Sequence, residues 1–172
     1  CPYCDFNSHE VRGAAPRDAY LDALLDDLDS EVTAAAGRSV ASVFIGGGTP
    51  SLFSARAIGA ILDGVSARVP LAPQAEITLE ANPGTVEHDR FEAYRSAGVN
   101  RISLGVQSFD DAQLSVLGRI HGGSEARRAI VSARRSRMAP SGSSHRDTPL
   151  ARGSSMLIFS TRITRSRGGE GT

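Results

Sequence analysis

The chain has 172 residues, 40% of them hydrophobic, which is typical of a globular domain with a sizeable core. It contains no apolar run near the ~18 residues that a membrane-spanning helix needs and no basic-then-apolar leader, so we expect a cytoplasmic protein. Its net charge is zero, and its basic residues are all Arg, a uniformity that does not by itself indicate a nucleic-acid-binding surface.

Both cysteines of the chain lie in the segment Cys1-Pro2-Tyr3-Cys4. This spacing brings two sulfurs to one side of a tight loop, where they can bind a single soft metal centre. For these two residues alone, a redox pair or half of a zinc site is the simpler interpretation. The chain begins without Met, and we expect its natural N-terminus to be missing.

Helices and strands are predicted to alternate along the next part of the chain. Apolar periodicity predicts helices over 18–36, 54–69, 85–97, 110–117 and 124–135, and buried strands over 40–45, 76–79 and 101–106. Ser54 and Thr85 are expected N-caps, and Gly37 and Gly98 are expected helix stops. Because short connections join strands to helices in alternation, the fold class is α/β with a parallel sheet and right-handed crossovers.

Each predicted strand ends in a motif able to contact a polar ligand. These motifs are Gly-Gly-Gly-Thr-Pro-Ser at 46–51, Glu-Ala-Asn-Pro at 80–83 and Gly-Val-Gln-Ser at 105–108. The carboxyl ends of parallel strands meet at one edge, where glycines let backbone approach a ligand and Glu80 and Gln107 offer carboxylate and amide groups. For any one motif alone, a tight turn or a helix cap is the simpler interpretation. We expect Asn82 and Pro83 to shape their loop, and His121 to be a surface or capping residue.

In this order, the Cys-x-x-Cys segment and the three motifs resemble radical S-adenosylmethionine (SAM) proteins. Within them, the resemblance is to the family of oxygen-independent coproporphyrinogen III oxidase and the heme chaperone HemW, over roughly residues 1–135. The family's cluster motif is Cys-x-x-x-Cys-x-x-Cys, and Cys1 and Cys4 match its second and third cysteines. The oxidase branch usually has a further cysteine where this chain has Phe6, which favours the HemW branch.

The resemblance implies two cofactors and a cargo. Cys1 and Cys4 would be metal ligands of a [4Fe–4S] cluster, SAM would bind beside it, and heme would be the possible cargo for a heme-accepting partner protein. Arg119 matches an Arg that contacts the SAM carboxylate, a pairing suited to a planar guanidinium, and Tyr3 matches a position whose backbone touches the adenine. The implied SAM-binding residues are Tyr3, Gly47, Gly48, Thr49, Glu80, Gln107 and Arg119.

The resemblance implies a partial (β/α) barrel, roughly the first half of about six units. We expect residues 1–135 to form this incomplete radical SAM core and residues 136–172 to be a Ser/Arg/Gly-rich tail, foreign or out of frame. The tail is expected to be disordered, although Met156 to Phe159 could form a short strand. The net charge is −4 over 1–136 and +4 over 137–172.

The sequence therefore predicts a HemW-like radical SAM protein involved in heme delivery. Two alternatives stay open: the oxidase, an oxidative decarboxylase of porphyrin biosynthesis, and a zinc or thiol binding module without a cluster. The chain itself is expected to be inactive, because two thiolates leave a cluster one protein ligand short and half a barrel leaves strand edges unpaired.

Overall fold

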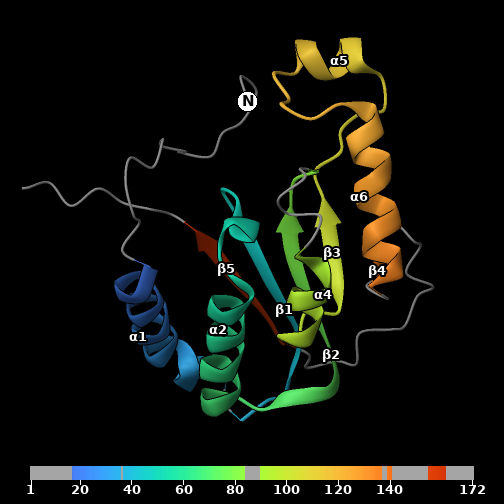
Figure 1. The fold of residues 1–172 in the computed structure, drawn as a ribbon. Coiled ribbons are helices and arrows are strands. Elements are labelled where there is room, and N and C mark those ends of the chain that lie inside the picture. Colours follow the sequence, from blue (N-terminus) through green and yellow to red (C-terminus); the bar gives the residue numbers. More distant parts are fainter. Residues whose placement is uncertain (1–16, 36, 84–89, 137–138, 141–154, 162–172) are drawn as a thin grey trace, which may run out of the picture.

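The computed structural model describes residues 17–35, 37–83, 90–136, 139–140 and 155–161 (Figure 1). Their strands form one five-stranded sheet in the order β4-β3-β2-β1-β5, and every adjacent pair is parallel. The α/β class with a parallel sheet is therefore confirmed. The elements are α1 (Arg17–Ala35), β1 (Val40–Gly47), the 3-10 helix η1 (Pro50–Leu52), α2 (Ala55–Arg68), β2 (Leu71–Ala81), α4 (Phe91–Ser96), β3 (Arg101–Leu104), α5 (Asp111–Val116), α6 (Gly123–Arg135), β4 (Ala139–Pro140) and β5 (Ser155–Thr161).

The strand register brings the three predicted motifs to the same edge of the sheet. Ile45 of β1 lies opposite Leu79 of β2, and Glu80 of β2 lies opposite Ser103 of β3. In Figure 1 the arrowheads of β2 and β3 point toward α5, which lies beyond this carboxyl edge. The segments that follow the strands therefore share one end of the molecule.

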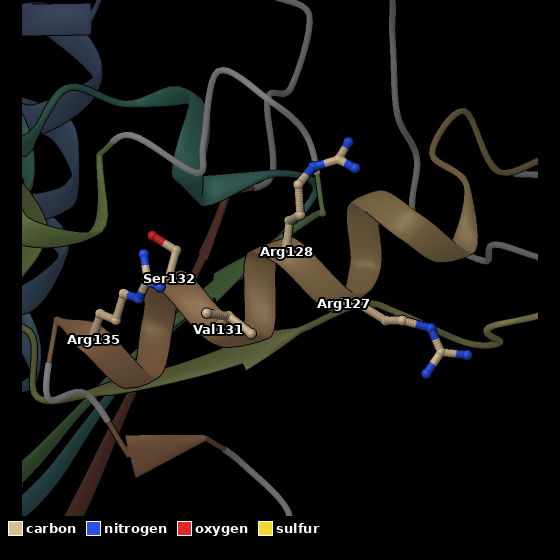
Figure 2. A pocket seen from close by; sticks show the side chains of 5 residues that line it. All are labelled: Arg127, Arg128, Val131, Ser132 and Arg135. Atoms are coloured by element: carbon tan, nitrogen blue, oxygen red, sulfur yellow. The ribbon is translucent and has the colours of Figure 1, made fainter.

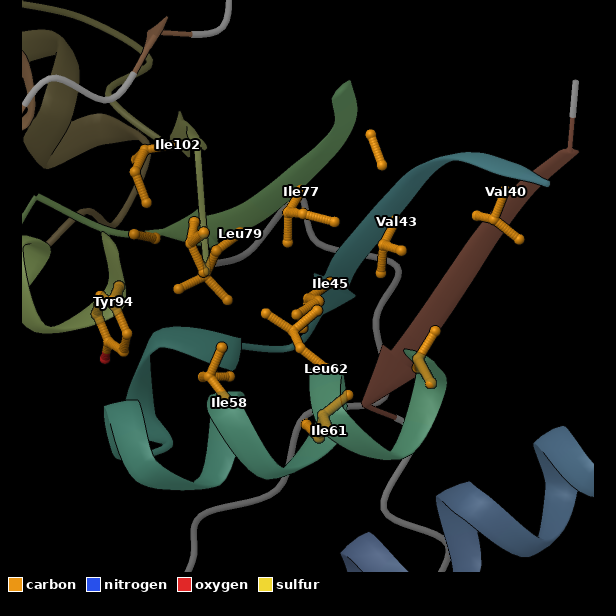
Figure 3. Close-up of a cluster of buried hydrophobic side chains, with 14 of the residues drawn as sticks. Val40, Val43, Ile45, Ile58, Ile61, Leu62, Ile77, Leu79, Tyr94 and Ile102 are labelled. Carbon is orange, nitrogen blue, oxygen red and sulfur yellow. The ribbon is translucent and has the colours of Figure 1, made fainter. Parts of the chain in front are cut away.

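Alternation along the strands builds a core between the sheet and α2. Val43, Ile45 and Leu79 are at most 2% exposed, and they project from the sheet face that α2 covers (Figure 3). The helix contributes its predicted apolar stripe, which comprises Ile58, Ile61, Leu62 and Val65. The hydrophobic effect thus holds the sheet against α2 and fixes which faces of the strands point away from it.

Helix α1 packs on α2 through the apolar face that the sequence predicted. Leu28 is buried, and Leu21, Leu24, Leu25 and Val32 are half-buried against the core. Asp22, Asp26 and Glu31 on the other face are exposed. None of the helices that the structure describes is long and apolar enough to cross a membrane.

One predicted helix cap is confirmed, and another cap is present that was not predicted. The Ser54 hydroxyl accepts a hydrogen bond from the Ala57 amide at the start of α2. Asp110 caps α5 in the same way, through the Gln113 amide. The expected cap Thr85 lies outside the described residues, and the described part of its helix is Phe91–Ser96.

All three predicted strands differ from their predicted bounds, and β1 ends at Gly47 rather than at 45. β2 begins at Leu71 rather than at 76, because Val40 pairs with Leu71 across an irregularity in the β1 register and so extends the ladder past the polar residues before Glu76. β3 ends at Leu104 rather than at 106. The chain turns there, since the Val106 amide donates to the Leu104 carbonyl and Gln107 adopts a left-handed φ of 60°.

Two segments of the expected tail, Ala139–Pro140 and Ser155–Thr161, form the strands β4 and β5, and disorder stays a prediction for the rest of residues 136–172. Ser155–Thr161 forms β5, which pairs in parallel with β1 from Val40 to Gly47. The possible strand at Met156 to Phe159 is therefore present. The edge of β1 was expected to be open, but it is paired, because the backbone groups of β5 form hydrogen bonds with those of β1. Residues 141–154 and 162–172 lie outside the described residues, and a boundary at 135 stays a prediction.

Candidate functional site

The glycine loop after β1 is held by a carboxylate from β2. The Gly47 amide donates to Glu80 Oε2 at 3.1 Å, and Gly47 has a left-handed φ of 119° that favours glycine. A Cβ on Gly46 would lie 2.5 Å from the Phe44 ring and 3.1 Å from Glu80 Oε2. The first two glycines are therefore required by the fold at this point, whereas Gly48 is exposed.

A second group of polar contacts links the ends of β2 and β3 to the segment between α5 and α6. Arg119 Nη2 donates to Asn82 Oδ1 at 2.7 Å and to the Gly105 carbonyl at 2.6 Å. Asn82 Nδ2 lies 3.5 Å from Thr49 Oγ1, a long hydrogen bond to the loop after β1. The Arg119 side chain is thus directed toward the carboxyl edge of the sheet.

Gln107 lies at the same edge in a strained conformation. Among the described non-glycine residues it is the one with positive φ, and its Oε1 is 3.5 Å from the position that a Cβ on Gly105 would take. His121 is 4% exposed, and its Nε2 contacts the Val106 carbonyl at 3.1 Å. The expectation of a surface or capping His is wrong, because His121 is buried against the turn that presents Gln107.

The segment after the glycine loop, which contains η1, is held by a side chain from α4. The Tyr94 hydroxyl lies 2.6 Å from the Ser51 carbonyl and 3.0 Å from the Phe53 carbonyl, so it bonds the backbone of η1 from helix α4. Tyr94 is fully buried. Sequence reasoning did not identify Tyr94 or the contact between Asn82 and Arg119, since both depend on residues that are about 40 positions apart in the chain.

Six of the nine predicted site residues lie at the carboxyl edge of the sheet. Five of them take part in the contacts described above, and the sixth is their neighbour in the glycine loop. They are Gly47, Thr49, Glu80, Gln107 and Arg119, with Gly48 adjacent. Cys1, Tyr3 and Cys4 lie outside the described residues. Within the part of the chain that the structure describes, no three His, Cys, Asp or Glu residues could hold a metal ion together.

A shallow hollow of about 380 Å³ lies elsewhere, on α6. Figure 2 shows its lining side chains on that one helix: Arg127, Arg128, Val131, Ser132 and Arg135. Arg127 also stacks on the Phe109 ring at 4.7 Å. None of these lining residues belongs to the polar contacts at the carboxyl edge, so the hollow and the candidate site are separate.

Comparison with known proteins shows which superfamily the chain belongs to. Residues 1–145 match the Radical SAM superfamily, and the chain therefore belongs to this superfamily. A solved structure, "Coproporphyrinogen III oxidase (HemN) from Escherichia coli is a Radical SAM enzyme", aligns with a TM-score of 0.69 and 29% identity, over 78% of this chain and 31% of that one. The expected radical SAM type of fold is thereby confirmed.

Several curated proteins have a higher sequence identity to this chain than that solved structure has. The heme chaperone HemW of Escherichia coli is 64% identical over 129 residues, which cover 75% of this chain and 34% of that protein. HemW of Haemophilus influenzae is 49% identical over 76% of this chain and 35% of that protein. Radical S-adenosyl methionine domain-containing protein 1, mitochondrial, of Mus musculus is 42% identical over 78% of this chain and 30% of its own length.

The chain spans about a third of the length of these curated relatives. It resembles the heme chaperone HemW and the oxidase HemN, and its resemblance to HemW has the higher identity. The suspected family is confirmed on these grounds.

Proposed function

We propose that the carboxyl edge of the sheet binds SAM, and that the chain is the SAM- and cluster-binding part of a HemW-like heme chaperone. The observation that carries this proposal is the pairing of Glu80 with the Gly47 amide beside an Arg119 anchored by Asn82 and Gly105. SAM has an ammonium, a carboxylate and a ribose diol. An acidic group, a guanidinium and exposed backbone complement these groups at one site.

Each implied binding residue has a role that its chemistry allows. The Glu80 carboxylate has acceptor capacity beyond its bond to Gly47 and would accept from ribose hydroxyls or the ammonium group. The Arg119 guanidinium would pair with the carboxylate, and the Gln107 amide can donate to one ligand group while it accepts from another. Gly47, Gly48 and Thr49 would border the ammonium group, and the Tyr3 backbone would contact the adenine.

Cys1 and Cys4 would be two of the thiolate ligands of a [4Fe–4S] cluster. Thiolates are the ligands that such clusters use, so the donor chemistry of this segment fits. The bound cluster would supply the electron for reductive cleavage of SAM. The chain's own residues would orient the ligand beside it, through Glu80 on one side and Arg119 on the other.

Heme as cargo, a heme-accepting protein and a cytoplasmic location belong to the same proposal. They are supported by the identity to HemW proteins, whose names state heme chaperoning. The second candidate is the oxidase, which the similarity to the HemN structure favours. Phe6, in place of a further cysteine, favours the chaperone.

The test uses two proteins. The 172-residue chain, reconstituted anaerobically with iron and sulfide, is expected to hold less than one cluster per chain and to form no 5′-deoxyadenosine above a Cys4→Ala control. A chimera in which residues 1–135 replace the matching segment of Escherichia coli HemW would supply the remaining ligands. We expect this chimera to take up a cluster and to bind heme, without vinyl product from coproporphyrinogen III.

Each contrary result points to one alternative. Vinyl product at useful turnover would favour the oxidase. Zinc in the purified chimera, with no uptake of iron and sulfide, would favour a zinc or thiol module.

A further inference from the structure

We propose that Asn82 is a positioning residue that acts through Arg119: its side-chain oxygen sets where the guanidinium meets the carboxylate of the ligand. This inference rests on the proposed SAM site, because it assumes that Arg119 pairs with a carboxylate.

The first step is the geometry of Arg119 Nη2. This nitrogen carries two hydrogens, and it has two acceptors at short distances, Asn82 Oδ1 at 2.7 Å and the Gly105 carbonyl at 2.6 Å. Hydrogen bonds from a charged donor are about twice as strong as neutral ones. The two acceptors of this nitrogen directly follow two different strands, because Asn82 comes after β2 and Gly105 comes after β3. The plane of the guanidinium is therefore fixed relative to the ends of β2 and β3.

The second step is that the Asn82 side chain accepts one hydrogen bond and donates another. Its Oδ1 accepts from Arg119 while its Nδ2 faces Thr49 Oγ1 at 3.5 Å. A side-chain amide is both acceptor and donor, whereas an ionised carboxylate only accepts. Asn82 therefore bridges the loop after β1 and the segment after α5, which are about 70 residues apart in the sequence.

The third step is the crowding around this contact. A Cβ on Gly105 would lie 3.0 Å from Asn82 Oδ1 and 3.2 Å from Arg119 Nη2. The Asn82 amide and the guanidinium therefore pack directly against the backbone of Gly105. Arg119 is half-buried here, and a long side chain held at one place loses less rotamer freedom on binding, which favours affinity.

A purely structural role for Asn82 makes a different prediction. If Asn82 only shaped its loop, its removal would weaken every ligand of the site and lower stability. If it positions Arg119, its removal weakens only ligands that have a carboxylate. SAM and 5′-methylthioadenosine separate the two cases, since both contain the adenosine and a sulfur and only SAM has the amino acid carboxylate.

The experiment is an NMR titration of the ¹⁵N-labelled 172-residue chain with each ligand. We expect Asn82→Ala to raise the Kd for SAM about tenfold, in keeping with the loss of a hydrogen bond to a charged group, and to change the Kd for 5′-methylthioadenosine less than twofold. In an Arg119→Ala background, Asn82→Ala is expected to have no further effect on SAM, because coupled residues are non-additive.

Asn100→Ala is the matched control. Asn100 also makes two side-chain hydrogen bonds, from the Ile77 amide and to the Ala75 carbonyl, both at 2.8 Å, but it precedes β3 at the opposite edge. It should lower stability without changing the Kd for SAM. Two results would overturn the positioning role of Asn82 but leave the proposed SAM site standing. One is an equal rise in the Kd for both ligands in the Asn82→Ala variant, and the other is a full further rise in the Kd for SAM when Asn82→Ala is added to Arg119→Ala. An unsubstituted chain that binds neither ligand would overturn the proposed function as well.

Discussion

The Glu80 carboxylate accepts a hydrogen bond from the Gly47 amide at 3.1 Å, between neighbouring strands β2 and β1. This contact ties the acidic group to the glycine loop and leaves it half-buried at the carboxyl edge. A carboxylate in this position can hold the loop and bind a cationic ligand at the same time.

The first prediction separates these two roles by Glu80→Gln. The amide oxygen can still accept from Gly47, so we expect the free energy of unfolding in urea to change by less than about 1 kcal/mol. The negative charge is lost, so the Kd for SAM should rise about tenfold. Asp63→Asn removes an exposed charge from α2 and is the control. An unchanged Kd in the Glu80→Gln variant would contradict the assigned role.

The second prediction concerns the buried Tyr94 hydroxyl. Tyr94→Phe removes the donor to the Ser51 carbonyl and leaves buried backbone oxygen without it. We expect a loss of about 1–3 kcal/mol in the free energy of unfolding, the usual cost of an unsatisfied buried polar group. Equilibrium urea unfolding measures it. A loss below about 0.5 kcal/mol would show that the hydroxyl does not hold η1.

The third prediction compares two glycines in helices. Gly59 lies within α2, and a Cβ there would make an ordinary contact at 3.7 Å with the Ala97 methyl group. Gly59→Ala should therefore stabilise the protein by about 0.5–1 kcal/mol, the gain in helix propensity. Gly123 begins α6, and a Cβ there would overlap the backbone oxygen of Phe109.

Gly123→Ala should consequently destabilise the protein and shift the Phe109 amide resonance. Thermal unfolding of both variants gives the comparison. The packing described for the start of α6 would be wrong if Gly123→Ala raised Tm as Gly59→Ala is expected to do.

The fourth prediction follows from the ion pair between α1 and α2. Arg68 bonds Asp29 through Nε at 2.7 Å and through Nη2 at 2.9 Å. The hydrogen bond to Arg68, aided by its charge, lowers the pKa of Asp29 below its ordinary 3.8. A lowered folded-state pKa stabilises the protein above the unfolded-state pKa, and this contribution is lost as the pH falls through the folded-state value.

Asp29→Asn should accordingly lower Tm at pH 7 and have no effect once the pH is below the folded-state pKa of Asp29. The effect should be small and shrink in 0.5 M salt, since Asp29 is 53% exposed and such pairs are screened. Asp22→Asn, on the exposed face of α1, is the control for a change in net charge. A difference between the Asp29 variant and the parent that persisted at low pH would contradict this account.

The helices and the positions of the strands could be predicted because their signals are local. The apolar stripe of α2 and the cap at Ser54 follow from neighbouring residues, and both are present. The convergence of Glu80 with the glycine loop also followed, since parallel strands end at one edge. These inferences needed only the period of the pattern and the order of the elements.

The remaining features depend on contacts between distant residues. The Asn82–Arg119 hydrogen bond spans 37 positions, and the Tyr94 hydroxyl reaches Ser51 across 43. The pairing of Ser155–Thr161 with β1 crosses most of the chain. No local pattern encodes such pairings, and the burial of His121 was missed because it depends on the fold of the turn before α5.

The most direct test of the account is where SAM binds on the chain. Titration of the ¹⁵N-labelled protein with SAM should shift the amides of Gly47, Gly48 and Gln107, and Glu80→Gln should reduce these shifts at equal ligand concentration. Shifts confined to the α6 hollow around Val131, or no shifts at all at millimolar SAM, would contradict the central claim that the carboxyl edge of this sheet is the SAM site.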